Sequence, residues 1–122
     1  MELNILRADP AGNITVFVLD PVEKVQRAAI AEKIMAIPAL KAEQVGYACA
    51  AEDDVDGHME MMGGEFCGNA TRAYGMYIAQ QKGGLSSVRL RVSGCDHVVT
   101  AQVDLKSGTA RAEMPCPRSV KR

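Results

Sequence analysis

The stretch Gly63-Gly64-Glu65-Phe66-Cys67-Gly68-Asn69-Ala70-Thr71-Arg72 places a single cysteine between glycines, where an extended segment changes into a helix. Residues 58–62 before it are typical of a strand. Residues 70–82 after it are good helix formers, and Gly83-Gly84 follows them as a stop signal. We therefore expect Cys67 near a helix N-terminus, where free backbone amides and the helix dipole favour negative charge.

This position favours a reactive thiol. A helix N-terminus stabilises a thiolate, and the thiolate is the reactive form of cysteine. The flanking glycines let a ligand approach the backbone, so the amides of Gly68 and Asn69 are placed to hold a carboxylate. The alternative is that Cys67 is a buried, inert residue and that the glycines form only a turn, which is the commoner situation.

The rest of the sequence predicts an α+β fold with one buried helix. The segment 70–82 is apolar on almost every side, as in a helix enclosed by other elements. Alternating apolar and polar residues after it indicate an antiparallel sheet with one face on the core. We therefore expect a mostly antiparallel, barrel-like sheet curled around a central helix. The expected strands cover residues 3–7, 14–19, 44–51, 58–62, 88–92, 101–105 and 110–114.

An earlier helix is expected to begin at Asp20-Pro21-Val22-Glu23. Asp20 is suited to be its N-cap, and Glu23 completes an arrangement similar to a capping box. Pro38 is expected to end this helix. Its apolar face is predicted along Val22, Val25, Ala29 and Lys33.

Length and composition indicate an ordinary globular domain. The 122 residues suffice for one core, and 48% hydrophobic with 24% charged residues is a typical balance. A net charge of −1 without a basic block argues against nucleic acid and anionic membranes as partners. No apolar run approaches the ~20 residues of a membrane span, and the N-terminus lacks a secretion signal. The cytoplasm is the expected location.

The cysteine spacing argues against metal and disulfides. No Cys-x-x-Cys pair occurs, whereas structural zinc sites usually contain close ligand pairs. Disulfides are uncommon in proteins that are not secreted. We expect no bound metal and structural roles for His58 and His97. The thiols expected to serve only packing or surface positions are Cys49, Cys95 and Cys116.

Three motifs resemble a known family. Gly64-x-x-Cys67-Gly68-Asn69-x-x-Arg72 resembles the first catalytic-cysteine motif of the diaminopimelate epimerase family and of related cofactor-independent amino-acid racemases. Gly12-Asn13-Ile14-Thr15-Val16-Phe17-Val18 is similar to the family's Gly-Asn-x-x-x-Val segment. Glu43-Gln44-Val45-Gly46-Tyr47 fits the segment that leads into the next strand. The matches occur in family order and span nearly the whole chain.

The resemblance implies a fold, a domain organisation and a partner. Family members are built from two similar barrel-like halves, each with a central helix and one catalytic cysteine. Residues 1–122 form a single domain that is similar to the N-terminal half, and residues 115–122 fall where the connection to the second half begins. The expected partner is therefore a C-terminal domain carrying the second cysteine. Without it, this half is expected to be inactive.

The resemblance also implies the chemistry and its residues. Two cysteines face opposite sides of Cα, one removing a proton while the other delivers one, so the centre is inverted without pyridoxal phosphate or another cofactor. By resemblance Cys67 is one acid/base group. Gly68 and Asn69 contact the amino-acid substrate, and Asn13 lines the site.

One departure from the family concerns the substrate. Diaminopimelate epimerases carry an Asn-Ala-Asp-Gly-type segment before the cysteine, whereas residues 60–64 are shorter and contain no asparagine. Gly-Asn-Ala also replaces the usual Gly-Asn-Gly. The resemblance therefore implies a racemase or epimerase for another amino acid. Glu65 is a candidate for contacting a cationic substrate side chain, the alternative being a solvated loop acid.

Two other functions stay open at this point. The chain could be a non-catalytic binding module or an inactive fragment of the same fold. It could also be an isomerase of the phenazine-biosynthesis type, although those enzymes lack the catalytic cysteine and Cys67 argues against this. The identity of the amino acid and the formation of a homodimer are open as well.

Overall fold

The computed structural model describes residues 4–8, 14–52, 54–95 and 98–112. These residues form a seven-stranded sheet and two helices. The strands are β1 (Ile5–Ala8), β2 (Thr15–Val18), β3 (Gln44–Cys49), β4 (Gly57–Met61), β5 (Ser87–Val92), β6 (Val99–Asp104) and β7 (Thr109–Ala112). The helices are α1 (Lys24–Met35) and α2 (Gly68–Gln81). The predicted α+β class is confirmed.

The strands lie in the sheet in their order along the chain. Four neighbouring pairs are antiparallel, which agrees with the predicted mostly antiparallel sheet. The β2–β3 and β4–β5 pairs are parallel. A parallel pair needs a crossover, and α1 and α2 supply the two crossovers.

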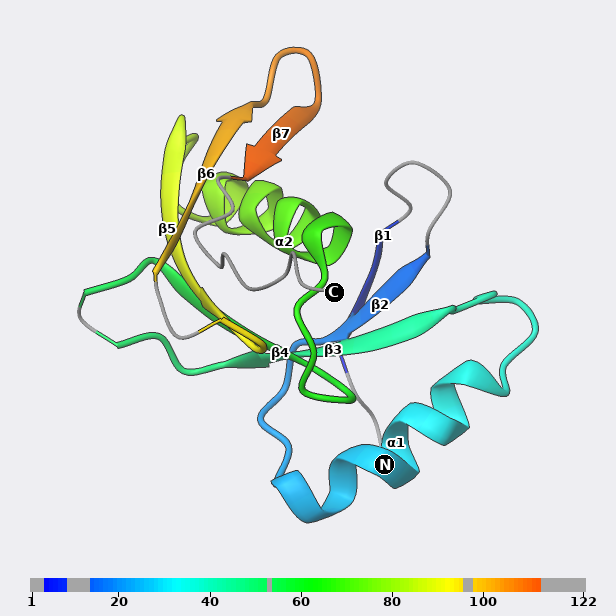
Figure 1. The fold of residues 1–122 in the computed structure, drawn as a ribbon. Coiled ribbons are helices and arrows are strands. Elements are labelled where there is room, and N and C mark those ends of the chain that lie inside the picture. Colours follow the sequence, from blue (N-terminus) through cyan, green and yellow to red (C-terminus); the bar gives the residue numbers. More distant parts are fainter. Residues whose placement is uncertain (1–3, 9–13, 53, 96–97, 113–122) are drawn as a thin grey trace, which may run out of the picture.

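The sheet curls around α2, which contacts β4, β5, β6 and β7 (Figure 1). A Cβ placed on Gly75 of α2 lies 2.9 Å from the Ala101 Cβ, so a larger residue there would push the helix away from β6. The central buried helix is confirmed. The curl is a half-barrel, because β1 and β7 are the two edges of the sheet.

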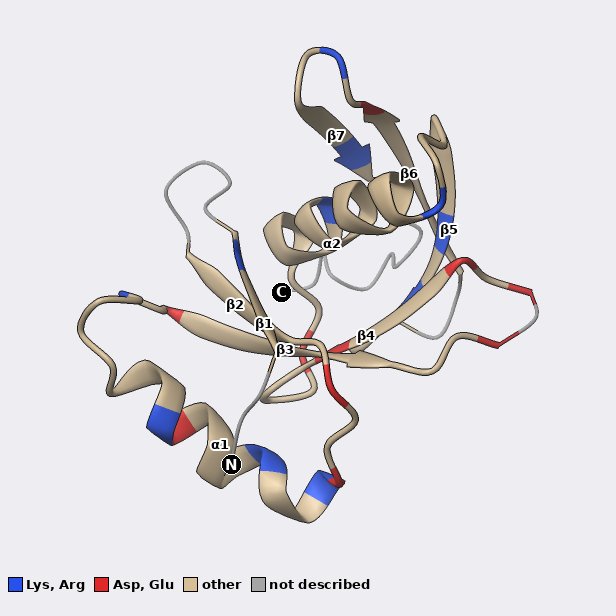
Figure 2. Cartoon of the chain, turned by 180° about the vertical axis from the view of Figure 1, so that it is seen from behind, with Lys and Arg blue, Asp and Glu red and all other residues tan. Residues whose placement is uncertain are grey.

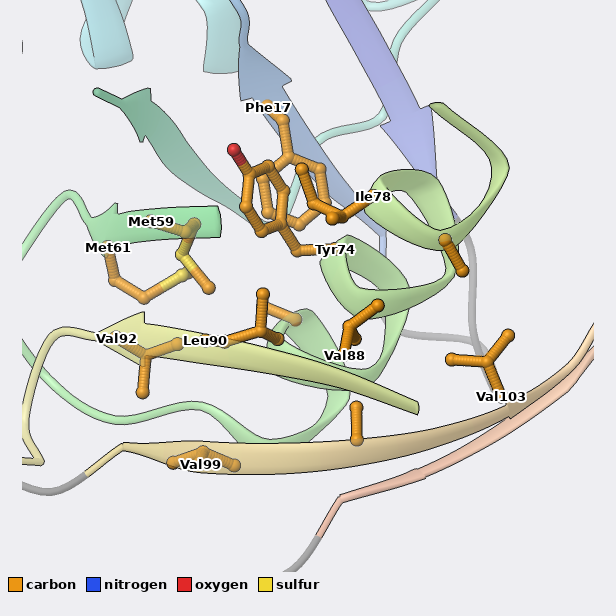
Figure 3. Close-up of a cluster of buried hydrophobic side chains, with 13 residues drawn as sticks. Phe17, Met59, Met61, Tyr74, Ile78, Val88, Leu90, Val92, Val99 and Val103 are labelled. Carbon is orange, nitrogen blue, oxygen red and sulfur yellow. The ribbon is translucent and has the colours of Figure 1, made fainter. Parts of the chain in front are cut away.

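The main core fills the space between α2 and the concave face of the sheet (Figure 3). Phe17 and Tyr74 lie with ring centroids 5.3 Å apart at its centre. Burial raises the pKa of Tyr74 to about 12. Met76 and Tyr77 are half-buried and pack against this core, as the apolar character of α2 predicted. The other fully buried members are Met59, Met61, Ala70, Ile78, Ala79, Val88, Leu90, Val92, Val99, Ala101 and Val103.

A second, smaller core lies on the opposite face of the sheet, under α1. Ile30, Ala31 and Ile34 of α1 pack there against apolar side chains of β2 and β3. Since both faces of β2 are covered, all four of its residues are buried. The second core also contains Val16, Val18, Val45 and Tyr47.

Two expectations for α1 are wrong. The helix begins at Lys24 with Glu23 as N-cap and has no side-chain cap. Asp20 instead accepts hydrogen bonds from the backbone and side-chain nitrogens of Asn4, at 2.7 and 3.1 Å. The predicted apolar face is also wrong, because Val25 is 86% exposed. Several sides of this helix carry apolar residues, so contacts with the sheet decide which one is buried.

Among the described residues, α1 carries charges of both signs, whereas the loop between β3 and β4 carries acidic residues (Figure 2). Among the described residues, neither helix combines the length and the apolar character that crossing a bilayer requires.

Candidate active site

Cys67 is the N-cap residue of α2. Its backbone is extended, with φ −132° and ψ 115°, and the helix begins at the next residue. The side chain is half-buried. The structure therefore confirms the predicted position at a helix start, one residue outside the first turn.

The first turn of α2 holds both the backbone and the sulfur of Cys67. The amide of Thr71 donates to the Cys67 carbonyl at 3.0 Å, and the Thr71 hydroxyl donates to the same oxygen at 2.8 Å. The amide of Ala70 points at the Cys67 Sγ at 3.5 Å. Among the described residues, no hydrogen bond engages the amides of Gly68 and Asn69, and both are thus left for a ligand.

A side chain from the sheet also reaches the sulfur. The Gln44 Nε2 lies 3.2 Å from the Cys67 Sγ and 2.9 Å from the Thr15 Oγ1. Gln44 and Thr15 are register partners in the parallel β2–β3 pair. Two N–H donors, from Gln44 and Ala70, are therefore directed at the sulfur.

Gln44 and Thr15 are site residues that the sequence argument assigned no role. Both lie within the motifs that carry the family resemblance. The missing signal is the pairing of β2 with β3, because only that register brings the amide of Gln44 to the hydroxyl of Thr15. A parallel β2–β3 pair could have been inferred from the helix between the two strands.

The other predicted site residues are placed differently. The Asn69 side-chain oxygen accepts a hydrogen bond from Arg72 one turn further along α2. This contact engages that oxygen and leaves the backbone amide as the part of Asn69 at the helix start. Glu65 is exposed in the loop before Cys67. Asn13 lies outside the described residues.

Neither of the other two described cysteines is a candidate for the second acid/base group. Cys49 is a free thiol on the opposite face of β3 from Gln44, because side chains alternate along a strand. Cys95 is disulfide-bonded, so the expectation of a thiol there is wrong. The expectation failed because disulfide formation depends on which cysteines the fold brings together, and not on their spacing in the sequence. Cys116 and His97 lie outside the described residues.

A polar cluster surrounds Cys49 on the α1 side of the sheet. Atoms of Cys49, His58 and Glu60 that could bind a metal lie within 4.8 Å of one another. The guanidinium of Arg27 forms an ion pair with Glu60 and lies 3.7 Å from the Cys49 Sγ. A metal cation would have to displace Arg27, so the arrangement fits an ion-paired network better than a metal site.

Two pKa values in this cluster are shifted in opposite directions. The hydrogen bond from Arg27 lowers the pKa of Glu60. Burial, followed by the negative charge of Glu60, raises the pKa of the Cys49 thiol. His58 Nε2 lies 3.3 Å from Glu60 Oε2, which is consistent with the structural role predicted for His58. Cys49 is therefore poorly suited to act as a base.

Four cavities are lined by described residues other than Cys67. One of about 850 Å³ runs along β6 and β7, and another of about 430 Å³ lies between α1 and the loop after β4. Smaller ones border Cys49 and the half-buried face of α2. Cys67 lines none of these four.

A thiol at the start of a buried helix, inside a curled sheet, and the family motifs around it place the chain among the amino-acid racemases related to diaminopimelate epimerase. The particular family follows from a direct match. The family model described as the histidine racemase CntK N-terminal domain matches residues 2–122, and the chain belongs to that family. The resemblance noted in the sequence is thereby confirmed.

Two curated relatives carry the same name. A histidine racemase of Fusobacterium nucleatum subsp. nucleatum is 42% identical over 79 residues, which are 63% of this chain and 27% of the relative. A histidine racemase of Staphylococcus aureus is 34% identical over 99 residues, which are 78% of this chain and 36% of the relative. The chain thus spans about a third of the length of these relatives.

Proposed function

We propose that this chain is the N-terminal half of a cofactor-independent amino-acid racemase with Cys67 as one of its two acid/base groups. The observation that carries the proposal is the position of the Cys67 sulfur, at the start of α2 and 3.2 Å from the Gln44 Nε2. Two N–H donors are directed at that sulfur, and the adjacent amides of Gly68 and Asn69 suit a carboxylate.

The chemistry is a proton exchange at Cα. The Cys67 thiolate takes the Cα proton and becomes a thiol, while a second thiol on the opposite face gives its proton to Cα. Negative charge that develops on the substrate carboxylate is stabilised by the amides of Gly68 and Asn69 and by the helix dipole. In the reverse direction the two cysteines exchange roles. Asn13 is proposed to line the same site.

The proposed substrate is histidine. The relatives at 42% and 34% identity are both named histidine racemases. A substrate other than diaminopimelate also agrees with the absence of asparagine from residues 60–64. Glu65, exposed two residues before Cys67, is proposed to contact the imidazole, because a carboxylate can accept a hydrogen bond from a ring N–H.

The proposed partner is a C-terminal domain of the diaminopimelate epimerase-like architecture that carries the second cysteine. Two-base inversion needs groups on both faces of Cα, so residues 1–122 alone are proposed not to racemise histidine. A homodimer and a cytoplasmic location stay predictions from the sequence.

The test is Cα exchange in heavy water. The longer protein should incorporate deuterium at Cα of L-histidine and produce D-histidine, measured by NMR and chiral chromatography. Cys67→Ser should lower turnover at least ~100-fold, the usual cost of losing an acid/base group. Cys49→Ser is the matched control and should keep turnover within about twofold, since Cys49 faces α1. Full turnover by Cys67→Ser, with the loss in Cys49→Ser, would overturn the assignment.

A further inference from the structure

The segment between β4 and Cys67 is a loop, in which the Gly64 amide donates to the Met61 carbonyl at 2.9 Å and Phe66 packs against the main core. Residues 62–65 are exposed, and Gly64 has a positive φ of 75°. Near its start, the Met62 amide donates to the Val45 carbonyl at 2.9 Å. The residues immediately before Cys67 belong to neither a strand nor a helix. Contacts from another part of the chain also hold the end of this loop, at Glu65 and Phe66, in position.

Ser93, in the turn after β5, joins the two ends of the loop with one hydroxyl. Its Oγ accepts a hydrogen bond from the Met61 amide at 2.8 Å. The same hydroxyl donates to the Glu65 carbonyl at 2.6 Å. The Ser93 amide donates to the Met59 carbonyl at 3.1 Å, which fixes Ser93 on β4. The loop is therefore closed by a side chain 28 residues away from Glu65.

At Gly94, the backbone of the turn after β5 lies in close contact with the backbone of the loop 62–66. A Cβ placed on Gly94 lies 2.2 Å from the Phe66 nitrogen and 2.7 Å from the Glu65 carbonyl carbon. Gly94 also has a φ of 77°, a conformation that side chains disfavour. Any other residue at this position must push Phe66, and with it the peptide that precedes Cys67, out of place.

The contacts of the Cys67 sulfur leave little tolerance for such a shift. Its distances to the Gln44 Nε2 and the Ala70 nitrogen are 3.2 and 3.5 Å, so a displacement of about 1 Å would end both hydrogen bonds. We propose that Ser93 and Gly94 are positioning residues, which hold the loop 62–66 so that the Cys67 thiol faces its N–H donors. The proposal rests on the function proposed above for Cys67.

The first test measures the thiol itself and needs no turnover. The rate of Cys67 alkylation by iodoacetamide is followed against pH, with the Cys67 peptide resolved by mass spectrometry. Ser93→Ala should change the rate at neutral pH by about threefold to tenfold and displace the midpoint of the pH dependence, because donors to the sulfur are misplaced. Ser93→Thr keeps the hydroxyl and should restore the parent profile. Gly94→Ala should act in the same direction as Ser93→Ala.

Ser107→Ala is the matched control. Ser107 lies in the β6–β7 turn, and its hydroxyl also contacts two groups, the Asp104 carbonyl at 3.5 Å and the Thr109 Oγ1 at 2.8 Å. It should leave the Cys67 profile unchanged. A role of Ser93 in folding alone would lower the melting temperature of Ser93→Ala without moving the profile of the folded protein. An unmoved profile would overturn the proposal, even if Gly94→Ala fails to fold.

The second test separates this proposal from the proposed function. In the longer protein, Ser93→Ala should lower kcat for histidine racemisation by about tenfold with a smaller change in KM, because the proton transfer depends on thiol placement. If Cys67→Ser keeps full turnover, the racemase assignment is wrong, whatever Ser93 does. If Cys67→Ser is inactive while Ser93→Ala is unchanged in both tests, only the positioning role is wrong.

Discussion

The two faces of the sheet each hold a half-buried free cysteine, yet in different surroundings. On the α2 side, Cys67 receives the N–H groups of Ala70 and Gln44. On the α1 side, the Cys49 sulfur also faces an N–H donor, the Arg27 guanidinium at 3.7 Å, but burial and the adjacent carboxylate of Glu60 raise the pKa of its thiol. Both sulfurs thus face N–H donors, and the neighbouring carboxylate is what sets the structural thiol apart from the candidate base.

The two faces also differ in the surroundings of their buried tyrosines, Tyr74 and Tyr47. Tyr74 on the α2 side is surrounded by apolar side chains and packs on Phe17. Tyr47 on the α1 side donates its hydroxyl to the Arg27 carbonyl at 2.5 Å and has the Arg27 guanidinium 5.1 Å from its ring. Tyr74 on the α2 side is thus held by apolar contacts, whereas Tyr47 on the α1 side also makes polar contacts with Arg27.

The largest expected effect is alkaline destabilisation, which is greater on the α2 side. Burial raises the pKa of Tyr47 on the α1 side, where the charge of Arg27 opposes the shift, and it raises the pKa of Tyr74 to about 12, against about 10 when unfolded. The folded state therefore keeps its full stability below about pH 10 and loses about 3 kcal/mol in total through Tyr74 as pH rises past 12. Urea unfolding followed by circular dichroism at pH 8–11.5 measures it.

Tyr74→Phe should remove most of this alkaline loss while keeping the ring contact with Phe17. Tyr77→Phe is the control, because it leaves Tyr74 in place and should retain the loss. If Tyr74→Phe shows the same pH dependence as the parent chain, other groups dominate the alkaline transition, and the packing contrast between the two faces has no such consequence.

The next effect concerns the two thiols directly. At pH 7.5 Cys67 should react with iodoacetamide at least about tenfold faster than Cys49, because burial and Glu60 disfavour the Cys49 thiolate. Peptide-resolved mass spectrometry of one sample compares both sites under identical conditions. Equal rates, or faster labelling of Cys49, would remove the electrostatic distinction between the two faces.

Much of the fold could be predicted because periodicity and turn residues are local signals. The α2 helix was expected over residues 70–82 and covers Gly68–Gln81, and its apolar circumference correctly indicated a buried position. The face of α1 was predicted wrongly because Ile30 and Ile34 are selected by contact with β2 and β3. That contact is tertiary and has no local signature.

The candidate site also contains features that could be predicted from the sequence and features that could not. Cys67 at a helix start could be predicted, since the flanking glycines and the following helix are adjacent in sequence. The contacts from Gln44 and Ser93 could not, because they join β3 and the turn after β5 to the loop before α2. Their sequence separations are 23 and 28 residues, and only strand pairing closes these distances.

The smallest expected effect lies in the ion-paired cluster of the α1 side. Because the hydrogen bond from Arg27 lowers the pKa of Glu60, the pair contributes stability above the unfolded pKa of about 4.3. This stability is lost as pH falls through the lower pKa of the folded state, below about pH 4.5. Partial exposure of both side chains limits its size to about 0.5–1 kcal/mol.

Glu60→Gln tests this pair with little change in shape. It should lower stability slightly at pH 7 and flatten the stability curve between pH 5 and 3, measured by urea unfolding. Asp54→Asn is the control, because Asp54 pairs with Arg91 at 2.8 Å but its side chain is 53% exposed, so its loss should change little. An acid dependence that survives unchanged in Glu60→Gln would mean that Arg27 stabilises the α1 face by its packing on Tyr47 alone.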